Sequence, residues 1–136
     1  MPQEYEIELK VRDYELDLQG IVNNSVYQNY LEHARHEYLL AHNVDFAALH
    51  AERIDLVVTR VEIDYKDSLK SQDRFVVKTS MSKEGNVRIV FHQRIERLPD
   101  QKTMIAAKIT GVCLKCGRPS RPETAGLELQ ELQEIQ

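Results

Sequence analysis

The sequence predicts an α+β domain in which one antiparallel sheet covers a single long helix. Three observations carry this prediction. An early segment alternates apolar and polar residues, one long segment repeats its apolar residues with helical period, and the second half is a series of strand-like segments joined by short turns. One helix can shield only part of such a sheet, so we expect a second copy of the chain to cover the rest, with a junction near Leu9, Val11 and Val77.

The first half of the chain contains one predicted strand and two predicted helices. Residues 5–14 alternate in polarity and predict a half-buried strand, and the loop over residues 15–25 contains Gly20. A helix is predicted from about Ser25 to His42, capped by Asn24 or Ser25, with a second short helix over 45–52. The predicted apolar face of the long helix consists of Val26, Tyr27, Tyr30, Leu31, Ala34, Tyr38 and Ala41.

The second half predicts an antiparallel meander, because its apolar, β-branched segments are separated by Gly- and Pro-containing turns. These strands are expected over residues 55–67, 75–81, 87–98 and 103–116. In the first of them, alternation predicts one face made of Val57, Thr59, Val61, Ile63 and Tyr65. The domain is expected to span residues 1–122, and residues 123–136 to form a polar C-terminal tail or a short helix.

Composition narrows the class of function. The chain has 136 residues, enough for one domain, with 18 Lys and Arg against 22 Asp and Glu and a net charge of −4. Nucleic-acid binders usually show a basic excess, so we expect no nucleic-acid partner. No apolar run reaches the roughly 18 residues of a membrane span. Two cysteines and the absence of a signal-like start make the cytoplasm the expected compartment.

The loop before the long helix contains the residues that could carry chemistry. Asp17 supplies a carboxylate, and Gly20 permits a sharp turn or close approach to a ligand. Asn23, Asn24 and Ser25 lie at the expected helix start, where unpaired backbone N–H groups can stabilise an oxyanion. A base or nucleophile beside an oxyanion site suits acyl transfer. The same residue types are also ordinary loop and cap residues. Strand position predicts that Val58 and Thr59 line the pocket beside this loop, and the other expected loop or pocket residues are Gly20, Asn23 and Tyr27.

A second candidate motif is Cys113 and Cys116, which form Cys-x-x-Cys. Structural zinc requires four ligands, and no second cysteine pair or close histidine pair follows. Redox pairs of this spacing normally precede a helix, whereas this pair ends a predicted strand. We therefore interpret these cysteines as structural, with no metal site.

The block from Asp17 to Arg35 resembles the hotdog-fold acyl-CoA thioesterases of the 4-hydroxybenzoyl-CoA thioesterase branch. It is most similar to plant acyl-lipid thioesterases and their bacterial relatives, through the segments VRDYELD, GIVNNSVY and HARHEYL. The residues that match the family pattern are Asp17, Gly20, Ile21, Val22, Tyr27, Glu32, Ala34 and Arg35. The resemblance implies a five-stranded antiparallel sheet wrapped around one long helix, sheets paired edge to edge between protomers, and active sites at that interface.

The resemblance also implies a chemistry. Asp17 occupies the position of the family's catalytic carboxylate and would attack the thioester carbonyl or activate a water. The backbone N–H of Asn24 or Ser25 would stabilise the oxyanion, and because a thiolate leaves readily, no cofactor is expected. The expected substrate is an acyl-CoA or acyl-carrier-protein thioester, and the expected assembly is a homodimer or homotetramer. The alternative is a non-catalytic acyl-binding dimer on the same fold.

Overall fold

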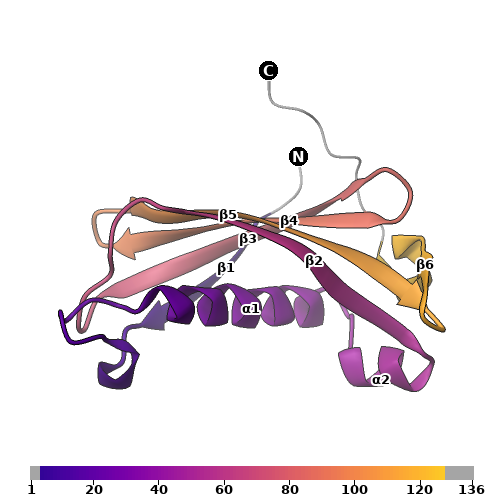
Figure 1. Cartoon of the computed structure of the whole chain (residues 1–136), viewed down its shortest axis with the longest axis horizontal. Helices are drawn as coiled ribbons and strands as arrows, with labels where there is room; N and C mark the ends of the chain where they lie inside the picture. Colours follow the sequence, from indigo (N-terminus) through magenta and orange to yellow (C-terminus); the bar gives the residue numbers. More distant parts are fainter. Residues whose placement is uncertain (1–3, 128–136) are drawn as a thin grey trace.

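The computed structural model describes residues 4–127, and it confirms the predicted fold class. A curled antiparallel sheet has the strand order β1-β3-β4-β5-β2, with a short β6 paired to β5, and wraps around the long helix α1 (Figure 1). The strands are β1 Tyr5–Lys10, β2 Ile54–Tyr65, β3 Arg74–Glu84, β4 Arg88–Leu98, β5 Lys102–Lys115 and β6 Arg118–Ser120. The helices are α1 Asn24–Ala41 and α2 Phe46–Ala51, with single 3₁₀ turns η1 Asp13–Glu15 and η2 Pro122–Ala125.

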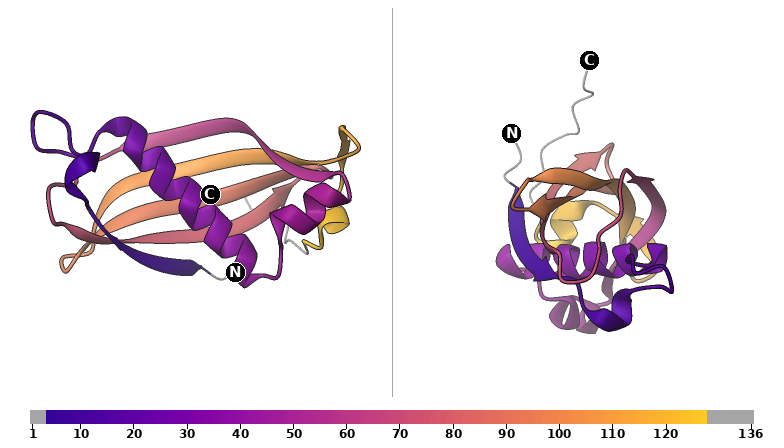
Figure 2. Two further views of the ribbon diagram at one scale, coloured as in Figure 1. Left: turned by 90° about the horizontal axis from the view of Figure 1, so that it is seen from below. Right: turned by 90° about the vertical axis from the view of Figure 1, so that its left-hand side faces the viewer.

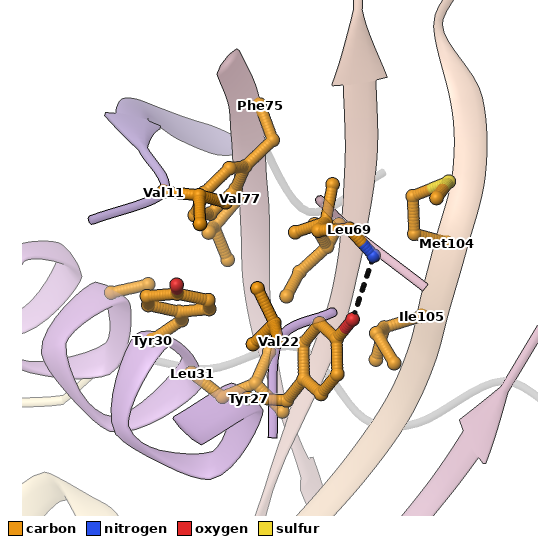
Figure 3. Packing of buried hydrophobic residues seen from close by; sticks show 12 residues of the cluster. Val11, Val22, Tyr27, Tyr30, Leu31, Leu69, Phe75, Val77, Met104 and Ile105 are labelled. Atoms are coloured by element: carbon orange, nitrogen blue, oxygen red, sulfur yellow. Dashed lines mark hydrogen bonds between the residues drawn. The ribbon is translucent and has the colours of Figure 1, made fainter. Parts of the chain in front are cut away.

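The core lies between the inner face of the sheet and α1, and the end-on view in Figure 2 shows the sheet curled around the helix. Its two clusters pack around the two halves of the helix. The helix buries most of the predicted face, but Val26 is only partly buried, Ala41 is exposed, and Leu39, which was not predicted, is buried. Val11 and Val77 lie inside the first cluster (Figure 3) with exposures of 2% and 0%, so they are not available for a junction between copies.

The start of α1 differs by one residue from the prediction. Asn23, not Asn24 or Ser25, is the N-cap: its backbone is extended, and its side-chain Oδ1 accepts the Ser25 backbone N–H at 3.0 Å. Asn24 is already the first helical residue. Three short polar residues in a row all suit a cap, and the choice between them depends on backbone geometry that composition does not specify.

The first strand is shorter than predicted. Pairing with β3 ends at Lys10, and the chain then forms the turn η1, which includes Tyr14. The buried Glu15 causes this, because its side chain accepts the Arg12 backbone N–H at 2.8 Å and closes the turn. A carboxylate that bonds back to the chain three residues earlier competes with strand pairing.

A β-bulge divides β2. Val58 pairs with Gly111 and Arg60 pairs with Thr110, which leaves Thr59 as the extra residue. The extra residue reverses which side chains face inward. Before the bulge, Ile54, Leu56 and Val58 face the core or its cavity, and after it Val61, Ile63 and Tyr65 face α1. The bulge at Thr59 therefore interrupts the predicted single face of Val57, Thr59, Val61, Ile63 and Tyr65.

The C-terminal part of the described chain belongs to the core. Ala125 and Leu127 are buried in the second cluster, at 5% and 4% exposure, after the turn η2. The packed structure thus continues past the predicted domain end at residue 122. The remainder of the predicted tail, residues 128–136, lies outside the described residues.

Candidate functional site

The loop that contains Asp17 is a tight, hydrogen-bonded turn. The Asp17 backbone N–H donates to the Ile21 carbonyl at 2.9 Å, and the Gly20 N–H donates to the Asp17 carbonyl at 3.1 Å. Gly20 has φ of 80°, the left-handed conformation that glycine adopts without strain. The loop is anchored at both sides by isolated bridges, between Leu16 and Val22 and between Ile21 and Lys70.

Within this turn, only one oxygen of the half-buried Asp17 carboxylate is held. Oδ1 accepts the backbone N–H of Gln19 at 2.8 Å and lies 3.4 Å from that of Ile21. For Oδ2, no partner occurs among residues 4–127. The carboxylate is therefore oriented by its own loop and keeps one oxygen for a reacting group.

A buried carboxylate that the sequence reasoning missed fixes the base of the loop. Glu15 is 8% exposed, and its Oε1 accepts the Tyr30 hydroxyl at 2.8 Å as well as the Arg12 N–H. Its carbonyl accepts the Asn23 N–H at 3.1 Å. Burial, together with the hydrogen bond to Glu15, raises the pKa of Tyr30, so the hydroxyl remains a neutral donor. The period of the helix places Tyr30 on its buried face, but no sequence signal pairs it with Glu15.

The helix start, which follows the Asp17 loop in sequence, offers one free backbone donor among residues 4–127. The Ser25 backbone N–H is engaged by Asn23 Oδ1, which also accepts the Ser25 hydroxyl at 3.0 Å. The Asn24 N–H has no acceptor among the described residues. Of the two predicted oxyanion donors, the geometry thus leaves Asn24 available in the unliganded chain and Ser25 occupied.

Tyr27 lies inside the protein rather than on a pocket wall. It is 1% exposed, and its hydroxyl accepts the Leu69 backbone N–H at 2.9 Å, the dashed contact in Figure 3. Burial raises the pKa of Tyr27. The Val22 N–H donates to the Leu69 carbonyl at 2.9 Å, so the Asp17 loop and the β2–β3 connection are joined to one another. Tyr27 therefore stabilises the Asp17 loop indirectly, through its hydrogen bond to Leu69.

A hollow lined mainly by apolar residues lies at the other end of α1. A cavity of about 210 Å³ opens between the C-terminal half of α1, the helix α2 and the inner face of β2, β4 and β5. Its walls are formed by Glu32, Arg35, His36, Leu39, Phe46, Leu56, Val57, Val58, Ile89, Phe91 and Gly111. Val58 and Thr59 were predicted to line a pocket beside the Asp17 loop. Val58 instead lines this more distant cavity, and Thr59 occupies the bulge and donates its hydroxyl to the Thr110 carbonyl at 3.2 Å.

One cation lies on the wall of this cavity. Arg35 donates through Nη1 to Gln93 Oε1 at 3.2 Å, and its guanidinium lies 5.9 Å from the centre of the Phe91 ring. The Gln93 amide is itself fixed, because its nitrogen donates to the Leu31 carbonyl and to Thr79 Oγ1, each at 3.0 Å. Burial lowers the pKa of Arg35, while Glu32 acts in the opposite direction.

Asp17 and the cavity do not meet within one chain. Asp17 is not among the residues that line the cavity. At 1.5 Å per residue, Glu32 lies about 12 Å along the helix from its first residue, Asn24. The strand β2 connects the two regions, with its Tyr65 end beside the Asp17 loop and its Ile54 end beside α2.

The Cys-x-x-Cys motif forms no disulfide: Cys113 is buried and Cys116 is exposed. Cys113 Sγ lies 3.5 Å from the Ser120 hydroxyl, at the β5–β6 hairpin. Over residues 4–127, no cluster of three or more His, Cys, Asp or Glu side chains is arranged to bind a metal ion. No helix in the same part of the chain is long and apolar enough to cross a membrane.

Comparison with known proteins gives a consistent result. Residues 11–131 match the model of the Thioesterase-like superfamily. The chain is 44% identical over 110 residues to the chloroplastic acyl-acyl carrier protein thioesterase ATL2 of Arabidopsis thaliana, an alignment that covers 81% of this chain and 58% of that one. It thus spans about 60% of the length of such plant relatives. It is 29% identical to the long-chain acyl-CoA thioesterase FadM of Escherichia coli, covering 79% and 80%.

Solved structures share the architecture. A 1,4-dihydroxy-2-naphthoyl-CoA thioesterase from Synechocystis superposes with a TM-score of 0.84 over 91% of this chain and 93% of that chain, at 14% identity. The probable thioesterase YbaW from Escherichia coli gives a TM-score of 0.76 at 30% identity, over 87% and 90%. The first of these shows a common fold alone.

Proposed function

Because the chain belongs to the thioesterase-like superfamily, we propose that it hydrolyses acyl-CoA or acyl-carrier-protein thioesters to a carboxylic acid and a thiol. The observation that carries this proposal is the Asp17 carboxylate, with one oxygen held by its own turn and the other open, close in sequence to the unpaired Asn24 N–H. The names of the relatives, which include acyl-carrier-protein and acyl-CoA thioesterases, support the substrate class.

Two routes use these groups. In the first, Asp17 removes a proton from water while the water oxygen bonds to the thioester carbon. In the second, the Asp17 oxygen itself bonds to that carbon, and water later cleaves the resulting anhydride. In both, the carbonyl oxygen becomes an oxyanion, which the Asn24 N–H and the positive end of α1 stabilise. The C–S bond then breaks, and the sulfur leaves as a thiolate that takes up a proton.

We place a second copy of the chain on the outer edge of β2. This strand has twelve residues and ends the sheet, and its apolar side chains Val57, Val58, Val61 and Tyr65 are 41–46% exposed. A long apolar edge of this kind invites pairing with another strand. Leu18, at the tip of the Asp17 loop, is fully exposed and would also be covered by a neighbour.

Two-fold pairing would complete the site. Antiparallel pairing of β2 with the same strand of a second copy brings the Tyr65 end of one chain beside the Ile54 end of the other. The Asp17 loop of one protomer then lies next to the cavity of its partner. This arrangement explains why neither chain alone joins its carboxylate to its apolar hollow. The two free cysteines suit a reducing compartment, and the cytoplasm remains our proposal.

Thiol release measured across short, medium, long, 3-oxo and aromatic acyl thioesters tests the proposal. We expect Asp17→Asn to lower kcat at least about 100-fold, because a correctly placed general base or nucleophile contributes that much. Asp13→Asn, an exposed neighbouring carboxylate, is the matched control and should retain activity. Full activity in Asp17→Asn would exclude its catalytic role. Tight acyl-CoA binding without turnover by the wild type would instead identify a non-catalytic acyl-binding dimer.

A further inference from the structure

Four cations gather at the end of the sheet that carries α2. Lys115 and Arg118 are register partners across the β5–β6 hairpin, and Arg121 directly follows β6. Arg53 precedes β2, and its carbonyl accepts the Cys116 backbone N–H at 2.8 Å, which ties it to the hairpin turn. All four residues are exposed. Figures 1 and 2 show β6 and α2 at the same end of the molecule. We call these four residues the hairpin cations.

These cations are not neutralised as others on the sheet are. On β2, β3, β4 and β5, the Lys and Arg side chains other than Lys115 have carboxylate partners, as in Lys78 with Glu96 at 3.0 Å and Arg88 with Glu84 at 3.4 Å. Among residues 4–127, none of the hairpin cations forms an ion pair. Glu52 and Asp55 flank Arg53, but Asp55 is engaged with His50 at 2.7 Å.

This arrangement works against folding stability. Like charges directly opposite each other on paired strands are destabilising, and Lys115 and Arg118 face each other in this way. The chain as a whole has a net charge of −4, so a basic cluster is not a consequence of its composition. Clustered, unpaired charge of one sign on the surface attracts an oppositely charged partner and accelerates its association.

The position of the cluster connects it to the cavity. Arg53 lies three residues before Leu56, which lines the apolar hollow together with Phe46 of α2. A partner bound to the hairpin cations would therefore be next to the wall of that cavity. It could pass a flexible arm into the cavity while its own surface remained on the hairpin.

We propose that the hairpin cations are the docking surface for an acidic carrier protein, which presents the acyl thioester on its phosphopantetheine arm. The proposal rests on the thioesterase function proposed above and specifies the carrier. A protein partner fits better than the phosphates of CoA, because Arg53 is the one hairpin cation that lines the hollow at the hairpin turn, and the other three are distributed along the hairpin outside it.

The test compares one acyl group on three carriers: a carrier protein, CoA, and N-acetylcysteamine, which has neither phosphate nor protein. The charge variant Lys115→Glu/Arg118→Glu/Arg121→Glu reverses three of the four charges. A second variant, Arg118→Gln/Arg121→Gln, only neutralises two of them and replaces the first if that protein does not fold. Lys10→Glu, an exposed unpaired cation on the opposite edge strand, is the matched control. Circular dichroism melting verifies the fold of each protein.

We expect kcat/KM for the carrier-protein thioester to fall at least tenfold in the charge variant and to stay within twofold in Lys10→Glu. The values for the CoA and N-acetylcysteamine thioesters should stay within twofold. Added salt should lower the wild-type rate on the carrier protein and leave the variant unaffected. An unchanged carrier-protein rate, or an equal loss with CoA, would overturn the proposal.

The two proposals fail in different ways. Hydrolysis of the N-acetylcysteamine thioester reports on the chemistry alone, so its absence in the wild type, along with that of the other two, would count against the thioesterase function. In that case, titration of the same proteins with the loaded carrier protein decides the docking proposal. Binding that is lost in the charge variant supports the surface, and binding that is retained overturns it.

Discussion

At the scale of single residues, the carboxylates of Asp17 and Glu15 are two positions apart and have opposite environments. Glu15 is buried and is bonded to Tyr30 and to the backbone, whereas Asp17 is half-exposed with one oxygen open. A buried carboxylate must be well bonded to be tolerated. We therefore assign Glu15 to positioning the loop and Asp17 to the reaction.

Tyr30→Phe isolates this positioning role. The change removes the hydroxyl that donates to the buried Glu15 carboxylate. We therefore expect the free energy of unfolding to fall by about 1.5–3 kcal/mol. Urea denaturation measures this loss. We also expect kcat to fall more than KM changes, because the loop geometry loosens. Tyr38→Phe is the matched control: it is buried on the same helix, and no hydrogen-bond partner of its hydroxyl occurs in residues 4–127. Equal losses in both variants would refute a specific role for the Glu15 contact.

For single residues, the sequence predicted positions in loops and turns better than it predicted contacts between distant residues. The loop position of Asp17 and the sharp turn at Gly20 follow from ordinary turn chemistry. The Glu15–Tyr30 pair joins residues fifteen positions apart, and a pattern of period two or 3.6 contains no information about such a pair. Asn23 as the cap was within one residue of the prediction, the usual uncertainty of a helix end.

At the scale of secondary-structure elements, the bulge in β2 is the main departure from simple alternation. Alternation predicted a strand here, and β2 over Ile54–Tyr65 confirms it. The extra residue was not predicted, because Thr59 is as typical of a regular strand as of a bulge. The one available signal was Gly111 in the middle of a strand, which often marks a bulge or a close backbone approach.

Gly111→Ala tests that close approach. A Cβ at this position would lie 2.7 Å from the Val57 carbonyl oxygen, on the bulged part of β2. Because that atom is backbone and cannot rotate away, we expect a loss of about 1–3 kcal/mol in the free energy of unfolding. Thermal or chemical denaturation measures it. A variant as stable as the wild type would show that β2 moves outward at no cost.

At the scale of the whole molecule, one chain has both parts of the proposed acyl-transfer site without bringing them together. The Asp17 loop and the apolar cavity lie at different ends of β2. The sequence predicted an incomplete unit, because one helix cannot cover five strands. Val11 and Val77 were expected at a junction between copies but are buried in the core. Periodicity alone did not predict that the exposed apolar edge would be β2, where we propose that a second copy pairs.

Val61→Lys tests the proposed pairing of β2. A charge on this edge should prevent antiparallel contact, because it would be desolvated without a partner. We expect the wild type to have a molar mass in solution of at least twice the 15.8 kDa of one chain. The variant should have the molar mass of a single chain. Size-exclusion chromatography with light scattering distinguishes them. Leu40→Lys replaces a similarly exposed apolar residue on α1 and should leave the assembly intact. A wild type that is monomeric at micromolar concentration would refute the pairing.

The bulge at Thr59 has a further consequence for how this protein can change. Because the inward-facing positions shift at that residue, the first half of β2 shapes the cavity and the second half packs against α1. Substitutions at Leu56 and Val58 can therefore alter the size of the hollow while the packing of Ile63 on the helix is untouched. A single strand thus contains two independently adjustable segments, and a library aimed at new acyl preferences could be confined to the first.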